Sequence, residues 1–253
     1  MKIIYFTGTG NSLFVAKHFK AELLSIPQKI KNNKYLIEDD VVGIVYPVYT
    51  NSVPDIVKKY LSKCKIKANY TFVIGTYGFN AGGSLNEMKR ILNFNGNKAD
   101  YYETLCMVDN YLPFFKIEKE LSGLKEKNIE NNLNHIIEEI NIRVKKSEDC
   151  GFFYNLVTFI ADKTVGKIKN YIPNLFSVND NCIGCGICKN VCPVSNIVQQ
   201  NKEKPIFGKK CESCLSCIHN CPKGAIQLAL QRSKTRFRNS EISLNEIIES
   251  NKN

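Results

Sequence analysis

Two short runs in the last third of this 253-residue chain hold eight of its 11 cysteines. The first run consists of Cys182, Cys185, Cys188 and Cys192, and the second of Cys211, Cys214, Cys217 and Cys221. Each run has the spacing C-x-x-C-x-x-C-x-x-x-C and is followed at once by a proline. This repeat constrains the fold strongly, because cysteines that must gather around an inorganic centre fix the backbone path between them.

The spacing is typical of cubane iron–sulfur centres, which need four thiolates at their corners. In such runs the C-x-x-C-x-x-C loop supplies three thiolates to one cluster, and the cysteine before the proline ligates the other. We therefore expect one 4Fe–4S cluster on Cys182, Cys185, Cys188 and Cys221, and a second on Cys211, Cys214, Cys217 and Cys192. Zinc sites and disulfides are the alternatives. Zinc leaves the Cys–Pro pairs unexplained, and disulfides are rare where cysteines are kept reduced.

Over its last 75 or so residues the chain resembles the bacterial ferredoxins that hold two 4Fe–4S clusters. This resemblance implies one-electron transfer at low potential through both clusters. The second run departs from the first, because Glu212 and Ser213 stand where the first run has Ile183 and Gly184. We therefore expect the two clusters to differ in hydrogen bonding and in potential.

Strand-like and helix-like segments alternate in the N-terminal part. Apolar runs at 2–6, 41–46, 70–76 and 101–108 predict buried strands. Segments with helical spacing lie at 13–24, 55–61, 84–92 and 129–144. Capping patterns at Ser52 and Ser84 precede the second and third of these helices. Repeated strand–helix units predict an α/β fold with a parallel sheet that is covered on both faces.

A loop of glycines and hydroxyls follows the first predicted strand: Thr7, Gly8, Thr9, Gly10, Asn11 and Ser12. Hydroxyls and free backbone amides at the start of a helix bind anions. The dinucleotide fingerprint G-x-G-x-x-G is not met, because its third glycine would fall at Leu13. The loop suits a terminal phosphate held by neutral groups, as in FMN, and a simple glycine turn is the alternative.

The same loop resembles the T/S-x-T/S-G-x-T/S phosphate loop of the flavodoxins, and the strand–helix order of the N-terminal part is similar to theirs. The resemblance implies a doubly wound, five-stranded parallel sheet with FMN at the carboxyl ends of its strands. Two further loops fall where that family holds the flavin ring. They are Pro47, Val48, Tyr49, Thr50 and Asn51, and then Thr76, Tyr77, Gly78, Phe79, Asn80, Ala81, Gly82 and Gly83.

Aromatic residues in these loops are the candidates to flank the ring. They are Tyr49, Tyr77 and Phe79, since the chain has no tryptophan. Each of them fits a place in the core equally well. A third loop, 110–113, is a further candidate to reach the site.

As a whole, the chain resembles the flavodoxin–ferredoxin fusion proteins of anaerobic prokaryotes. The predicted parts are a flavodoxin-like FMN domain at 1–147, a helical linker at 148–178, and a small α+β ferredoxin-like domain with a tail at 179–253. We expect the basic residues of the tail, 232–238, to be solvated or to clamp the domains together, with partner docking as the alternative. The isolated His18, His135 and His219 are expected to be neutral surface or core residues.

The resemblance predicts an electron-transfer protein that moves single electrons between FMN and an external redox protein through the two clusters. The alternatives are a flavoenzyme that reduces a small acceptor at the flavin, and a binder of nucleic acid or anionic membranes. The formal net charge is +11. Two oxidised clusters with their thiolates and the FMN phosphate bring it to about +5, which argues against nucleic acid.

The longest apolar run, 151–161, is too short to span a bilayer, and the N-terminus lacks the pattern of a signal peptide. We therefore expect a cytoplasmic protein without a transmembrane segment. No oligomeric state follows from these patterns.

Overall fold

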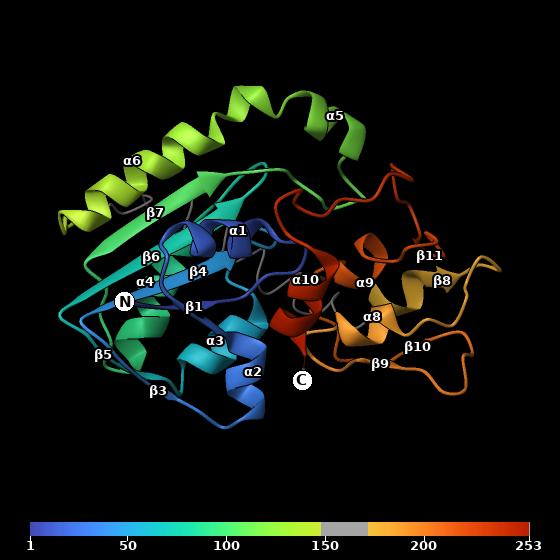
Figure 1. The fold of residues 1–253 in the computed structure, drawn as a ribbon, viewed down its shortest axis with the longest axis horizontal. Helices are drawn as coiled ribbons and strands as arrows, with labels where there is room; N and C mark the ends of the chain where they lie inside the picture. The colour runs from blue at the N-terminus through green and yellow to red at the C-terminus, as the bar shows by residue number, and fades with distance from the viewer. Residues whose placement is uncertain (148–171, 253) are drawn as a thin grey trace.

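Five parallel strands form the central sheet of the N-terminal domain in the computed structural model, which describes residues 1–147 and 172–252 (Figure 1). They are β1 (Lys2–Tyr5), β2 (Glu22–Ser25), β4 (Val41–Pro47), β6 (Tyr70–Tyr77) and β7 (Tyr101–Cys106). Their order across the sheet is β2-β1-β4-β6-β7. Numbered along the chain this is 2-1-3-4-5, the order of the flavodoxin-like doubly wound fold. The predicted α/β class and five-stranded sheet are confirmed.

Successive residues of each strand point to opposite faces of the sheet, so both faces carry apolar side chains, and helices cover both. Ile3 and Tyr5 join one apolar cluster, whereas Ile4 and Phe6 join another. The first cluster includes α1 (Asn11–His18) and α6 (Ile129–Asn141), and the second includes α2 (Ile26–Lys31), α3 (Asp55–Leu61) and α4 (Ser84–Phe94). The remaining elements of this domain are β3 (Leu36–Glu38), β5 (Lys65–Lys67), α5 (Ile117–Ser122) and the short helix η1 (Lys125–Lys127). None of the helices in the described residues is long and apolar enough to cross a membrane.

The edge strand β2 was missed by the sequence pattern. Helical spacing predicted one helix over 13–24, but α1 ends at His18, and β2 pairs with β1 through Leu23 and Ile3. Lys20 has a φ of 50° between the two elements, and a left-handed residue there turns the chain out of the helix. The segment Glu22–Ser25 has two adjacent leucines and no alternation, so nothing in its pattern indicates a strand.

The predicted caps at Ser52 and Ser84 were wrong, since neither α3 nor α4 has a side-chain cap. Glu87, expected to complete the second cap, reaches the loop after β4 instead. Its Oε2 accepts from the Ser52 hydroxyl at 2.9 Å and from the Val53 N–H at 2.8 Å. Its Oε1 pairs with Lys58 at 2.7 Å. This nearly buried carboxylate therefore ties α4 to a loop that borders the site described below.

Short strands and helices form the cysteine-rich C-terminal domain. They are η2 (Ile172–Leu175), β8 (Phe176–Val178), α8 (Ile187–Asn190), β9 (Ile197–Val198), β10 (Ile206–Phe207), α9 (Ser216–His219) and β11 (Ile226–Leu228). Strand β8 pairs antiparallel with β11, and β9 with β10, which gives the expected small α+β arrangement. The domain thus begins by Phe176, inside the segment 148–178 that was predicted as a linker. Residues 148–171 of that segment lie outside the described residues.

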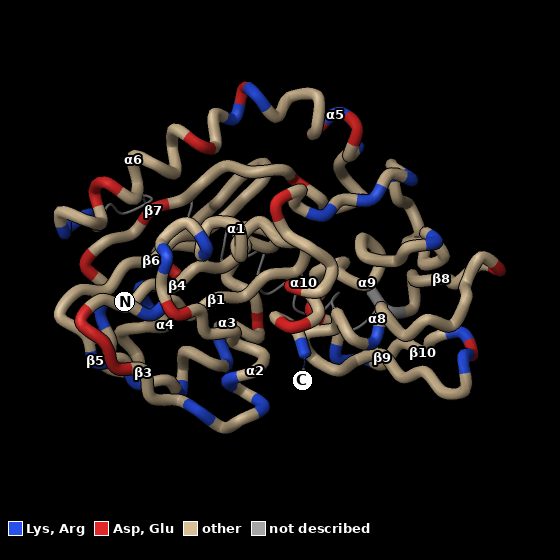
Figure 2. The backbone as a smooth tube through the Cα atoms, in the orientation of Figure 1, with Lys and Arg blue, Asp and Glu red and all other residues tan. Residues whose placement is uncertain are grey.

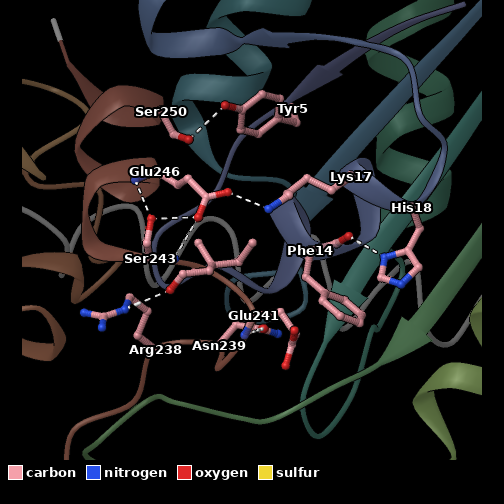
Figure 3. Close-up of polar contacts among 11 residues, drawn as sticks. Tyr5, Phe14, Lys17, His18, Arg238, Asn239, Glu241, Ser243, Glu246 and Ser250 are labelled. Atoms are coloured by element: carbon pink, nitrogen blue, oxygen red, sulfur yellow. Dashed lines mark hydrogen bonds and ion pairs between the residues drawn. The ribbon is translucent and has the colours of Figure 1, made fainter.

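The C-terminal tail returns to the N-terminal domain and packs against α1 and α2 (Figures 1 and 3). Its helix α10 (Leu244–Asn251) begins with the predicted capping box of Ser243 and Glu246. Glu246 Oε1 lies 2.6 Å from Lys17 Nζ, and Ser250 Oγ lies 2.8 Å from Tyr5 Oη. The tail therefore connects the two domains. Within the basic segment 232–238, expected to be solvated or to clamp them, Arg232 donates to the Phe114 carbonyl oxygen at 3.1 Å.

Candidate functional site

The eight clustered cysteines surround two small cavities in the C-terminal domain. Cys182, Cys185, Cys188 and Cys221 line the first, which we call the first cysteine cavity. Cys192, Cys211, Cys214 and Cys217 line the second cysteine cavity. Each cavity takes three cysteines from one run and the fourth from the other. The structure thus brings together the same two sets of four that the spacing predicts.

The chemistry of these thiols fits an iron–sulfur cluster. Burial raises the pKa of the Cys188 and Cys211 thiols to about 11, so a thiolate at either position needs a nearby cation to stabilise it. Backbone N–H groups also approach the sulfurs, with Asn196 N at 3.2 Å from Cys192 Sγ. No three His, Cys, Asp or Glu side chains among the described residues are close enough to share a single metal ion. A cubane cluster instead places each thiolate on a different iron.

A larger cavity of about 260 Å³ opens beyond the carboxyl ends of β1, β4 and β6. Ligands of doubly wound sheets bind at this position. Fifteen of the residues predicted to bind the flavin line it: Thr7, Gly8, Thr9, Asn11, Ser12, Pro47, Val48, Tyr49, Thr50, Asn51, Thr76, Tyr77, Gly78, Phe79 and Asn80. We call it the large cavity.

Two hydroxyls of the first loop, those of Thr7 and Thr9, are candidates to donate to an anion. Thr7 Oγ1 accepts from the Gly10 N–H at 3.1 Å, and Thr9 Oγ1 accepts from Asn110 Nδ2 at 2.7 Å. Both oxygens accept one hydrogen bond, and each hydroxyl keeps its hydrogen to donate. The third hydroxyl of the loop, Ser12 Oγ, already lies 2.8 Å from Thr76 Oγ1. Among the described residues that line the large cavity, Asp109 is the one charged side chain. The wall therefore fits a phosphate held by neutral donors.

Three predicted residues, Gly10, Gly82 and Gly83, do not line the large cavity. Gly10 precedes α1 with a φ of 106°, and a Cβ there would lie 2.9 Å from the Asn239 Cβ of the tail. A Cβ at Gly82 would lie 2.5 Å from the Asn51 Cβ, and Gly83 directly precedes α4. The missing side chains of Gly10 and Gly82 let the loops pack closely.

The loop after β7 contributes more of the wall than the sequence indicated. It supplies Val108, Asp109, Asn110, Tyr111, Phe114 and Phe115, of which only Asn110 and Tyr111 were candidates. Burial raises the pKa of the Asp109 carboxyl, whose Oδ1 accepts from the Tyr111 N–H at 3.0 Å. Phe79 and Phe114, 77% and 67% exposed, lie on this wall. The loop 108–115 follows the carboxyl end of β7, and that position is the signal that could have identified all of its residues as candidates.

The wall of the large cavity also includes Ser213 and Cys214 from the C-terminal domain. Cys214 therefore lines both the large cavity and the second cysteine cavity. Gly8 faces it from the other domain, since a Cβ at Gly8 would lie 2.8 Å from Tyr49 Oη and 3.0 Å from the Cys214 carbonyl oxygen. The large cavity and the second cysteine cavity thus share a wall, and the absence of a side chain at Gly8 permits the contact.

Two buried polar residues of the second run help to hold the domains together. Glu212 Oε1 accepts from the Ile56 N–H at 3.3 Å, at the start of α3. His219 Nδ1 accepts from the Phe237 N–H at 3.1 Å, and its Nε2 donates to the Asn110 carbonyl oxygen at 2.8 Å. Burial lowers the His219 pKa to about 4, so the ring is neutral, as expected for a core histidine.

Residues 181–239 match the family model of the 4Fe–4S dicluster domain. An uncharacterized ferredoxin of Methanocaldococcus jannaschii is 30% identical over 64 residues, which are 24% of this chain and 83% of that protein. The residues matched by the family model include all eight cysteines that line the two cysteine cavities.

Solved structures of low similarity match the N-terminal part. The Megasphaera elsdenii flavodoxin is 18% identical, with coverage of 41% of this chain and 83% of that chain and a TM-score of 0.30. A Streptococcus pneumoniae flavodoxin is 13% identical, with coverage of 56% and 98% and a TM-score of 0.36. These likenesses are weak, and the flavodoxin-like assignment is based on the strand order. The chain therefore belongs to the 4Fe–4S dicluster ferredoxins through its C-terminal domain, which is fused to a flavodoxin-like domain.

Proposed function

We propose that this protein carries single electrons between an FMN in the large cavity and an external redox protein, by way of two 4Fe–4S clusters. The observation that supports this most strongly is the position of Cys214, which lines both the large cavity and the second cysteine cavity. A cluster ligand in the wall of a flavin site gives a short route between the two groups. Fusion of the carriers also keeps their effective concentration high.

The residues of the large cavity divide into two groups in this proposal. Thr7 and Thr9 donate hydroxyl hydrogens to the phosphate, together with backbone N–H groups at the start of α1 that have no acceptor within the helix. Tyr49, Tyr77 and Phe79 flank the ring. When bound, FMN supplies one- and two-electron redox chemistry, and each cluster exchanges one electron.

The external partner docks where the first cysteine cavity reaches the surface. Cys185 is exposed, and the neighbouring Ile183 is 56% exposed. The exposed Lys223 lines this cavity, and the exposed Lys189 directly follows Cys188 in the sequence. Figure 2 shows basic residues on the cysteine-rich domain. Positive charge at this position favours an acidic partner, with an association rate that falls as salt rises.

The exposed aromatic residues on the wall of the large cavity favour a second candidate function. Phe79 lies 5.8 Å from Phe115 between ring centroids, and Tyr111 lies 5.5 Å from Phe114. Such a surface suits a small apolar acceptor that would be reduced at the flavin. In that case the clusters would deliver electrons to a flavoenzyme, and the large cavity would also bind its substrate.

Cofactor analysis of anaerobically purified protein tests the proposed function. We expect about eight irons and eight sulfides per chain, from the eight cysteines of the two runs, and one FMN. Stepwise reduction, followed by absorbance and electron spin resonance, should show separate one-electron cluster signals and the bleaching of a flavin. Protein that contains zinc in place of iron, or that does not bind FMN, would contradict the proposal.

A further inference from the structure

The first loop of the large cavity is held in place by residues from distant parts of the chain. Thr9 Oγ1 accepts from the side-chain amide of Asn110 at 2.7 Å, and the Thr9 carbonyl oxygen accepts from the Asn239 N–H at 2.9 Å. Asn239 Nδ2 also donates to Asn11 Oδ1 at 3.3 Å. Thr9, Asn11 and Asn110 all line the large cavity. The loop after β7 and the C-terminal tail therefore both fix the proposed phosphate loop.

A buried histidine of the second cysteine run lies behind the contact with Asn110. His219 is only 4% exposed, and its Nδ1 accepts from the Phe237 N–H at 3.1 Å. A ring nitrogen that accepts carries no hydrogen, so the hydrogen of the ring is on Nε2. Nε2 donates it to the Asn110 carbonyl oxygen at 2.8 Å. His219 is thus connected to the Thr9 hydroxyl through one residue, Asn110.

Asn110 depends on such a contact because it lies in a loop outside helices and strands. There the neighbouring backbone does not hold the carbonyl group, and a side chain takes that part. With its carbonyl oxygen held by His219, Asn110 keeps its amide within reach of Thr9 Oγ1. An oxygen that accepts from this amide keeps its own hydrogen to donate to a ligand. A donor that is oriented before the ligand arrives loses less entropy on binding.

We propose that His219 is a positioning residue for the phosphate of FMN, which acts through Asn110 to keep the Thr9 hydroxyl in place. This inference rests on the proposed function, because it assumes that FMN occupies the large cavity with its phosphate at the loop 7–12. His219 lies between Cys217, which lines the second cysteine cavity, and Cys221, which lines the first. The segment that supplies ligands to both clusters therefore also supports the flavin site.

Two substitutions at His219 each keep one of its hydrogen bonds. The amide nitrogen of glutamine lies as many bonds from the backbone as Nε2 of histidine, so His219→Gln can still donate to the Asn110 carbonyl oxygen. The side-chain oxygen of asparagine lies as many bonds from the backbone as Nδ1, so His219→Asn can still accept from the Phe237 N–H but loses the bond to Asn110. We expect His219→Asn to weaken FMN binding by about two- to tenfold, the effect of one hydrogen bond. His219→Gln should bind FMN like the wild type.

Riboflavin separates a role at the phosphate from a general loosening of the structure. It has the ring of FMN but no phosphate, so its affinity should be the same in the wild type and in His219→Asn. The matched control is His135→Asn, at a histidine whose side chain is 70% exposed, and it should leave FMN affinity unchanged. The measurement is a titration of each flavin, followed by quenching of its fluorescence, into cluster-loaded protein from which FMN has been removed.

A double variant tests whether His219 acts through Asn110. Asn110→Ala removes the amide that reaches Thr9 and should weaken FMN binding by itself. Addition of His219→Asn should weaken binding little further, because residues that act through one chain of contacts have effects that do not add. Full additivity of the two effects would show that His219 does not act through Asn110.

The outcomes separate this inference from the proposed function. If the wild type binds FMN and His219→Asn binds it equally well, the inference is wrong. Equal losses of FMN and riboflavin affinity in His219→Asn would also overturn it, since the effect would then be general. The same is true if His219→Gln is as weak as His219→Asn. Failure of the wild type to bind FMN at all would instead contradict the proposed function.

Discussion

Replacing Cys221 by serine should remove the cluster of the first cysteine run, although Cys221 belongs to the second run. The reason is its place in the first cysteine cavity with Cys182, Cys185 and Cys188. Iron should fall from about eight to about four per chain, because a cubane cluster rarely survives the loss of one thiolate. Cys192→Ser should remove the other cluster by the same argument.

Double variants show which cysteines share a cluster. Cys182→Ser combined with Cys221→Ser should leave about four irons, as either single variant does, since both act on one cluster. Cys182→Ser combined with Cys192→Ser should leave almost none. Cys64→Ala, at a buried cysteine of the flavodoxin-like core, is the control and should keep the full iron content. Loss of all iron from the double variant of Cys182 and Cys221 would show that the two runs do not exchange ligands.

Replacing Gly8 by valine should weaken FMN binding by about 5- to 150-fold, because overpacking of this kind costs about 1–3 kcal/mol. A Cβ at Gly8 would lie 2.8 Å from Tyr49 Oη and 3.0 Å from the Cys214 carbonyl oxygen. A side chain here must displace either Tyr49 or the loop that carries Cys214. An FMN titration measures the loss of flavin affinity. A shift in the spin-resonance signal of the second cluster would report displacement of the loop that carries Cys214.

The control for this variant is Gly123→Val, at the end of α5. A Cβ there would meet nothing nearer than the Lys119 carbonyl oxygen at 3.7 Å, so FMN affinity should be unchanged. Equal FMN affinity in Gly8→Val and Gly123→Val would mean that the contact between the two domains at Gly8 is irrelevant to the flavin site.

Patterns within one domain were predictable from the sequence, because spacing and periodicity report local geometry. The repeat of cysteines gave the two sets that line the cysteine cavities. The strand ends gave most of the wall of the large cavity. The edge strand β2 was missed because four residues with two adjacent leucines carry no period. Ser52 and Ser84 matched a capping pattern, but the Glu87 carboxylate found better donors in a neighbouring loop.

Contacts between the domains were not predictable from spacing. Ser213 and Cys214 reach a cavity whose other lining residues lie at least 98 positions earlier, and only domain docking brings them there. Two residues of the second run nevertheless indicate where the domains meet. Glu212 and Ser213 are the positions where the second run departs from the first, and both face the flavodoxin-like domain. The departure that predicted a difference between the clusters therefore also marks the interface.

The central claim is that electrons pass between the external partner and the flavin through the clusters, and single-turnover reduction of the flavin tests it most directly. Wild-type protein loaded with FMN and iron is mixed anaerobically with a reduced, acidic one-electron donor protein, and flavin absorbance is followed in time. The same measurement is made on Cys182→Ser, which retains FMN and the second cluster but lacks the first. The account predicts that the flavin of this variant is reduced at least about tenfold more slowly than that of the wild type. Flavin reduction at the wild-type rate in the variant would contradict it.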